Sequence, residues 1–153
     1  MKISYKFIPE ISINESFNLN KVSDADLFYD SFEGDVFFSN ETSGHELVFD
    51  GITIYDFILN FKNTLNELEH SSNSEIDFTE SDLIVSFKKR DELVEIFSEL
   101  TELSIEVGFE ELKASGNGFI KSFCKDLIRF YPNNETYKFI FDKLDLKRED
   151  LTN

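Results

Sequence analysis

Three apolar runs decide the fold: Leu83-Ile-Val-Ser-Phe87, Leu93-Val-Glu-Ile-Phe97 and Leu103-Ser-Ile-Glu-Val107. They are short and rich in β-branched and aromatic side chains, which is the composition of strands, and charged residues separate them. We therefore expect an antiparallel meander between residues 76 and 107. Residues 91–100 also satisfy helical spacing, but we prefer a strand because the run is short and its neighbours are strands.

The residues before the meander predict further strands. Residues 2–13 alternate between apolar and polar types, and Pro9 interrupts them, which suggests an edge strand or a bulge. Two more strands are expected at residues 32–38 and 46–49. The turn-rich segment 39–44 joins them, so this pair has the length and composition of a hairpin.

The period of the apolar residues changes after Gly51, where we expect the third strand to have ended. An amphipathic helix of about four turns is expected to start at Thr53, whose side chain and that of Asp56 suit a capping box. The polar run at residues 70–74 ends it. Its apolar positions are Ile54, Phe57, Ile58, Phe61, Leu65 and Leu68.

Two C-terminal helices are expected after the meander. Residues 109–114 fit either the end of a strand or a first helical turn, and Ser115-Gly-Asn-Gly118 reads as a break. A helix should follow from Phe119 to Tyr131 and stop at a Pro-Asn-Asn stretch. A third helix should bury one side of residues 137–144, and the tail from Lys147 should fray.

The composition indicates a single domain over residues 1–153. The 18 Phe and five Tyr supply abundant core material. The chain contains no run of about 18 apolar residues, and its N-terminus lacks the apolar core of a secretion signal. Cys124 is the only cysteine, so no internal disulfide can form, and we expect a cytoplasmic protein. The expected fold class is α+β: an antiparallel sheet of N-terminal hairpin strands plus the central meander, packed against the amphipathic helix and the two C-terminal helices.

Signatures of catalysis or cofactor binding are missing from the sequence. His45 and His70 lie in different predicted loops without a convincing set of metal ligands, and Cys124 has no local nucleophile signature. Gly116-Asn-Gly118 lacks the lysine of a phosphate loop. Carboxylate pairs are expected by number alone in a chain with 31 acidic residues. We therefore expect a protein that is not an enzyme and uses no cofactor and no metal.

The distribution of charge is the informative feature. The net charge is −16, and residues 22–112 carry 23 acidic and four basic side chains, a net of −19. Residues 1–21 sum to +1 and residues 113–153 to +2. Such a charge disfavours direct contact with nucleic acid or an anionic membrane and favours a basic partner. The alternative is a solvated surface that only keeps a Phe-rich protein soluble.

One segment combines carboxylates with aromatic residues: Asp24-Ala-Asp-Leu-Phe-Tyr-Asp-Ser-Phe-Glu-Gly-Asp35. Aromatic anchors ringed by acidic groups suit an interface with a basic cleft, although the aromatics could equally belong to the core. A calcium loop is excluded because Tyr29 stands where an EF-hand needs glycine. The expected partner-binding residues are Asp24, Asp26, Phe28, Tyr29, Asp30, Glu33 and Asp35, followed by Glu75 and Asp77.

The order of hairpin, amphipathic helix, meander and C-terminal helices resembles the small immunity proteins of bacterial polymorphic toxin systems, including contact-dependent growth inhibition. The residues that carry this likeness are Phe32-Glu-Gly-Asp-Val-Phe-Phe38, the helix from Thr53, and residues 83–87 followed by 103–112. The resemblance implies a cytoplasmic antidote that forms a heterodimer with a cognate basic toxin domain, often a nuclease, and covers its active site or substrate groove. A nucleic-acid mimic that inhibits a DNA-binding protein and a housekeeping interaction domain are the alternatives.

Overall fold

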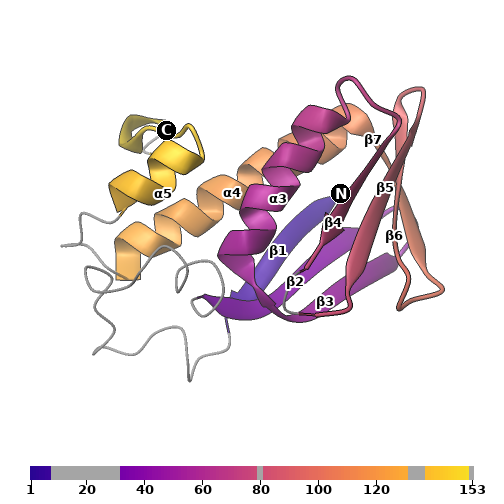
Figure 1. Cartoon of the computed structure of the whole chain (residues 1–153), viewed down its shortest axis with the longest axis horizontal. Coiled ribbons are helices and arrows are strands. Elements are labelled where there is room, and N and C mark those ends of the chain that lie inside the picture. Colours follow the sequence, from indigo (N-terminus) through magenta and orange to yellow (C-terminus); the bar gives the residue numbers. More distant parts are fainter. Residues whose placement is uncertain (8–31, 79–80, 131–136, 152–153) are drawn as a thin grey trace.

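The computed structural model describes residues 1–7, 32–78, 81–130 and 137–151 (Figure 1). These residues form seven strands in two antiparallel sheets, together with helices, so the expected α+β class is confirmed. The three-stranded sheet has the order β1-β2-β3, with β1 (Lys2–Phe7), β2 (Glu33–Asn40) and β3 (His45–Thr53). The four-stranded sheet has the order β4-β5-β6-β7, with β4 (Asn73–Asp77), β5 (Ile84–Arg90), β6 (Leu93–Ser98) and β7 (Ser104–Gly108).

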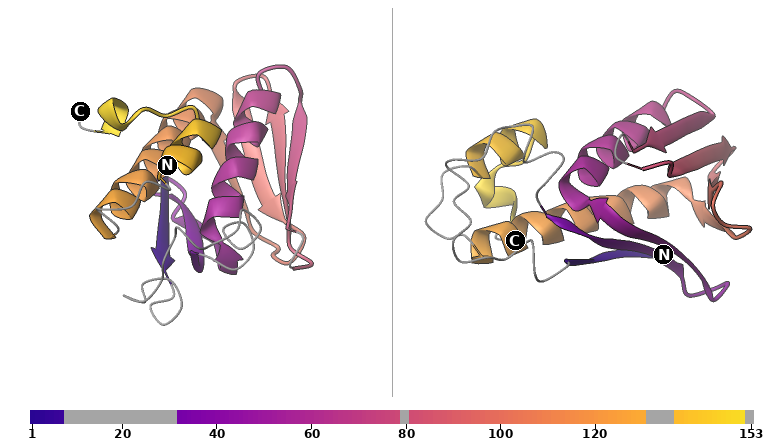
Figure 2. Two further views of the ribbon diagram at one scale, coloured as in Figure 1. Left: turned by 60° about the vertical axis from the view of Figure 1, so that its left-hand side comes forward. Right: turned by 60° about the horizontal axis from the view of Figure 1, so that its bottom comes forward.

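The helices hold the two sheets together. The described helices are α3 (Ile54–Glu67), α4 (Phe109–Phe130), α5 (Tyr137–Lys143) and a 3₁₀ turn, η2 (Arg148–Leu151). Figure 2 shows α3 and α4 on one face of the three-stranded sheet, with the four-stranded sheet beside α3. The two sheets also meet directly near the tip of the β2–β3 hairpin, where Asn40 Nδ2 donates a hydrogen bond to the Glu106 carbonyl at 2.9 Å.

Phenylalanine rings fill the space between the helices and the three-stranded sheet. The ring of Phe38 lies 5.5 Å from that of Phe49, 5.9 Å from Phe57 and 5.6 Å from Phe61, each in an edge-to-face arrangement. Such aromatic pairs contribute about 0.5–1.5 kcal/mol beyond the burial of their area. The inward-facing side chains of β2 and the apolar face of α3 therefore pack into one core.

The meander follows the sequence expectation and extends it by one strand. Residues 93–98 are a strand that pairs with both β5 and β7, so the preference for a strand over a helix is confirmed. Residues 109–114 are the first turns of α4. The sequence analysis missed β4 because its inward residues are Ser74 and Ile76, and a serine conceals the alternation. Ser74 Oγ donates to Glu67 Oε2 on α3 at 2.6 Å, which satisfies this buried hydroxyl.

The break expected at residues 115–118 is wrong, because α4 runs through them without interruption. Gly116 lies where α4 crosses α3: a Cβ at this position would lie 2.8 Å from Phe61 Cε1 and 2.9 Å from Leu65 Cδ1. The glycine therefore allows two helices to approach closely and does not end one of them. Gly118 is exposed and faces open space.

Three smaller expectations also need correction. The strand predicted to end before Gly51 continues to Thr53 through an irregularity in the β2–β3 pairing. Thr53 stands at the N-cap of α3, but its side chain makes no capping hydrogen bond. Instead of fraying, the tail forms the turn η2 and buries Leu151 among the core residues.

Candidate partner-binding cleft

The acidic and aromatic residues predicted to bind a partner are only partly within the described structure. Asp24, Asp26, Phe28, Tyr29 and Asp30 lie outside the described residues. The remaining four belong to different sheets, Glu33 and Asp35 to β2 and Glu75 and Asp77 to β4.

Phe32 begins the described part of the acidic–aromatic run. Its side chain is buried and its ring lies 5.7 Å from that of Phe123 on α4. For this aromatic residue, the interpretation that the run supplies core side chains is therefore the right one.

Asp35 holds the backbone of the neighbouring strand. The pairing of β2 with β3 shifts register between Gly34 and Val36, and Asp35 stands at that shift. Its Oδ1 accepts a hydrogen bond from the N–H of Gly51 at 3.0 Å, and Gly51 has a φ of +62°. A left-handed glycine opposite a register shift is typical of a β-bulge, and bulges change the direction of nearby side chains. The side chain next to this bulge is that of Asp50.

Glu75 and Asp77 point outward from β4. Ile76 between them is buried, as the alternation of a strand requires. Glu75 Oε1 accepts a hydrogen bond from Ser86 Oγ on β5 at 3.1 Å, which ties this carboxylate to the sheet. Asp77 is exposed and is the last residue of β4.

A cleft of about 300 Å³ opens between the three-stranded sheet and one end of the four-stranded sheet. Its floor contains the buried side chains of Phe49 and Leu83. Strand β3, the segment before β5, and the end of β6 with the turn after it each contribute three residues. We call it the acidic cleft, lined by Val48, Phe49, Asp50, Ser81, Asp82, Leu83, Ser98, Leu100 and Thr101.

The rim of the acidic cleft carries carboxylates that are not neutralised. Asp50 and Asp82 are exposed, and neither forms an ion pair with any described residue. Glu99 and Glu102 are exposed in the same turn as Leu100. The described residues of β3 and of the segments 77–84 and 98–104 include no lysine or arginine. The described residues of these three segments therefore contribute carboxylates and no lysine or arginine to this end.

Two leucines are exposed among these carboxylates. Leu100 is 69% exposed and Leu103 is 50% exposed. The turn that carries Leu100 is held by hydrogen bonds, since Ser98 Oγ accepts from the N–H of Leu100 at 3.2 Å and the Ser98 carbonyl accepts from that of Thr101 at 3.1 Å. The apolar side chain is therefore presented by an ordered backbone. Exposed apolar groups inside a polar rim are typical of an interaction surface.

Two lysines at the opposite end of the four-stranded sheet have partners within the same chain. Lys89 Nζ donates a hydrogen bond to the Leu68 carbonyl at the end of α3, 2.8 Å away, and lies 4.0 Å from the centre of the Phe109 ring. Lys113 forms ion pairs with Glu110 at 2.7 Å and Glu69 at 2.8 Å. The hydrogen bond from Lys113 lowers the pKa of the Glu69 carboxyl below its ordinary value.

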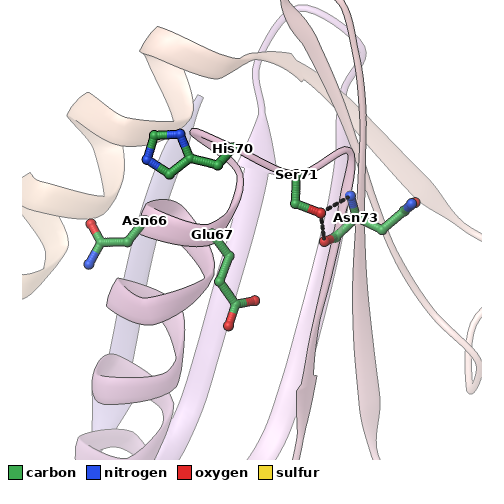
Figure 3. A pocket seen from close by; sticks show the side chains of 5 residues that line it. All are labelled: Asn66, Glu67, His70, Ser71 and Asn73. Atoms are coloured by element: carbon green, nitrogen blue, oxygen red, sulfur yellow. Dashed lines mark hydrogen bonds between the residues drawn. The ribbon is translucent and has the colours of Figure 1, made fainter.

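A second hollow, of about 470 Å³, lies at this opposite end, beyond the last turn of α3 (Figure 3). Ser71 Oγ donates to the Asn73 carbonyl at 2.8 Å and accepts from its N–H at 3.2 Å. Glu67 already accepts the hydroxyl of Ser74, and Figure 3 shows it directed away from His70. Within this open hollow Ser71 and Asn73 therefore bond to each other, and Glu67 bonds to a residue outside its lining.

Groups suited to covalent or metal chemistry are sparse in the described chain. Burial raises the pKa of the Cys124 thiol to about 12, which suppresses the reactive thiolate. Within the described ranges, no three His, Cys, Asp or Glu side chains are arranged to hold a metal ion. The acidic cleft itself contains neither histidine nor cysteine.

No family model, no curated protein and no solved structure matches this chain. Of the helices that the structure describes, none is both long enough and apolar enough to span a membrane.

The sequence analysis did not select the residues of the acidic cleft. Asp50, Asp82 and Leu100 are far apart in the sequence and come together only because β3 lies beside the ends of β5 and β6. A local signal existed in Glu99-Leu-Thr-Glu-Leu103, where two leucines alternate with acids in a segment too polar to be core. Residues 99–102 fall between two predicted strands, and Leu103 begins the next predicted strand.

Proposed function

We propose that this protein is an antidote that binds a basic toxin domain and blocks it by covering its active site or substrate groove. The observation that supports this proposal is the rim of the acidic cleft, where Asp50 and Asp82, which form no ion pair with a described residue, line the same cleft as exposed Leu100. The resemblance of the element order to immunity proteins supplies the class of partner. The partner is cytoplasmic, as is the antidote.

The carboxylates act first at long range. A field of one sign steers an oppositely charged protein toward the contact face and raises its association rate. In the complex, Asp50 and Asp82 take positions that the phosphates of a nucleic-acid substrate would otherwise occupy. The negative charge of the cleft also disfavours direct binding of the antidote to nucleic acid.

The apolar groups then supply affinity. Interfaces draw most of their binding free energy from a few side chains that lose their contact with water at the centre, while the rim excludes solvent. Leu100 lines the acidic cleft, and Leu100 and Leu103 are both exposed beside Glu99 and Glu102 in the sequence, so they would supply such side chains. Inhibition by coverage requires no catalytic group from this chain, which accords with a cleft that contains neither histidine nor cysteine.

Growth rescue tests this function. The product of the gene next to this chain's gene is taken as the candidate toxin and expressed in a bacterial host with and without the chain, and growth is measured. We expect rescue by the native chain, and calorimetry with the purified toxin domain should give a one-to-one complex that weakens as salt increases. Absence of rescue together with absence of binding would overturn the proposal. Equal binding to several unrelated DNA-binding proteins would instead indicate a nucleic-acid mimic.

A further inference from the structure

We infer that the acidic cleft accepts an extended segment of the partner in which arginine or lysine alternates with apolar residues, laid along the edge of β3. This inference rests on the proposed function and names the chemistry of its occupant. Three observations support it: the size of the cleft, the edge of β3 that pairs with no other described strand, and the separation of apolar floor from acidic rim.

The size of the cleft fits a short piece of chain. Its volume of about 300 Å³ lies at the lower limit of small-molecule pockets. That space admits one or two side chains with the backbone that carries them. The acidic cleft would therefore bind one peptide segment of the partner, as part of a larger interface between the two proteins.

The edge of β3 offers backbone groups to such a segment. Among the described strands β3 pairs with β2 alone, and its residues Val48, Phe49 and Asp50 line the cleft consecutively. An edge strand presents N–H and C=O groups that an added strand can satisfy.

Ser98 offers a further donor inside the cleft. This residue is only 1% exposed. Its Oγ accepts from the Leu100 N–H, but its own O–H donates to no residue within the described ranges. A buried hydroxyl that keeps an unused donor can bind a carbonyl oxygen of the occupant.

The side chains of the cleft favour an occupant in which apolar and basic residues alternate. Successive side chains of an extended segment point to opposite sides. Apolar side chains of the occupant would contact Phe49, Leu83 and Leu100, while the intervening arginine or lysine side chains would reach Asp50 and Asp82 at the rim. Neither carboxylate forms an ion pair with a described residue. Binding of the occupant would therefore not break an ion pair between described residues.

A peptide titration tests the inference directly. The ¹⁵N-labelled chain is titrated with the blocked peptide acetyl-Leu-Arg-Leu-Arg-Leu-amide while backbone amide shifts are recorded. We expect saturable shifts concentrated at residues 48–50, 81–83 and 98–101. The peptide with serine in place of leucine should bind at least about ten-fold more weakly, and the peptide with glutamate in place of arginine should not bind. Equal binding of the leucine and serine peptides, or shifts centred elsewhere, would overturn the inference.

Matched variants separate the cleft from charge in general. Asp50→Asn with Asp82→Asn removes two charges at the cleft, and Asp91→Asn with Glu92→Gln removes two at the opposite end of the same sheet. Only the first pair should weaken peptide binding, by about five-fold, since exposed pairs contribute modestly. Leu100→Ser should weaken it by about ten-fold, whereas Leu93→Ser, at a leucine that is 46% exposed, should not.

The same variants distinguish the two proposals. The toxin domain could bind the chain in a salt-dependent manner while the cleft variants bind it as tightly as their controls. In that case the toxin domain binds elsewhere on the chain, the inference about the cleft fails and the antidote function stands. If the toxin domain does not bind the chain at all, the proposed function fails. A peptide that still fills the cleft would then identify a basic partner of another kind.

Discussion

The two ends of the four-stranded sheet use charge in opposite ways. At one end, Lys89 and Lys113 contact a helix carbonyl, aromatic rings and carboxylates of the same chain. At the other end, Asp50 and Asp82 border a cleft and lie near exposed Leu100, with no ion pair to any described residue. The first arrangement stabilises the fold, and the second leaves charge available to another molecule.

This difference separates stability from binding in a way that mutations can test. Charged groups with internal partners should matter to unfolding and not to a partner. Charged groups without internal partners should do the reverse, because removing them exposes no unsatisfied group and relieves mutual repulsion.

Lys89→Met should have the largest effect on stability. Methionine keeps much of the aliphatic stem but loses the hydrogen bond to the Leu68 carbonyl and the contact with the Phe109 ring. A hydrogen bond from a charged donor contributes about 1.5–3 kcal/mol, so the free energy of unfolding in urea should fall by about 2 kcal/mol. Peptide binding at the acidic cleft should not change.

Arg90→Met is the control for this variant, because Arg90 is an exposed neighbour on the same strand. Its effect on unfolding should stay within about 0.5 kcal/mol. Equal effects of the two variants would show that the internal contacts of Lys89 do not stabilise the fold.

Gly51→Ala should have the next largest effect on stability. At the cleft end we expect the backbone conformation of the bulge, and not the charges of the rim, to contribute to the stability of the fold. The φ of +62° at Gly51 disfavours any L side chain by about 1–2 kcal/mol, and no atom lies near enough to clash with the added Cβ. Urea unfolding should detect this loss, and peptide affinity should fall because Asp50 moves. Unchanged stability and affinity would mean that the bulge does not position the rim.

Neutralising the cleft by Asp50→Asn with Asp82→Asn should leave the unfolding free energy within about 0.5 kcal/mol of the native value, with any change toward greater stability. The same protein should bind the leucine–arginine peptide more weakly. A clear loss of stability in thermal unfolding would show that these carboxylates have a structural role, and the contrast between the two ends would disappear.

The smallest expected effect is on the pH dependence of stability, and it involves Glu69 and Lys113 at the end of the sheet opposite the cleft. Lys113 lowers the pKa of the Glu69 carboxyl in the folded chain, so this pair stabilises the fold above the unfolded pKa. That contribution is lost as the pH falls from about 4.5, the ordinary value, through the lower folded pKa. Glu69→Gln should make urea unfolding less sensitive to pH in this range.

The control for the pH experiment removes the cation. In a Lys113→Met background, Glu69→Gln should have a smaller effect on the pH dependence, because the carboxyl has lost the main group that lowers its pKa. An identical effect in both backgrounds would assign the pH dependence to other carboxyl groups.

Much of the fold could be predicted because its signals are local. The alternation in residues 83–107 predicted three strands, and three- and four-residue spacing predicted α3. Strand β4 was missed where a serine takes an inward position. The break expected in α4 was wrong because a glycine-rich tetrapeptide usually ends a helix, whereas Gly116 here fits against Phe61 of α3.

The candidate site was less accessible to the same reasoning. The sequence established that negative charge is concentrated in residues 22–112, but it could not say which carboxylates share a face. Glu75 was chosen for its charge, and the structure places it on the outward side of β4, a strand that the sequence did not predict. Asp82 and Leu100 were not chosen. Asp35 was selected for its charge, while the structure gives its carboxylate a backbone partner 16 residues away.

The sequence by itself determined the α+β class, the main strands of the meander and the excess of acids over bases, since each is written in neighbouring residues or in simple counts. Only the tertiary structure decided that the strands divide into two sheets, that the lysines near one end find partners, and that Asp50 and Asp82 meet across a cleft. The physical reason is that pairing between distant segments depends on how complementary surfaces pack, and no local pattern encodes that choice.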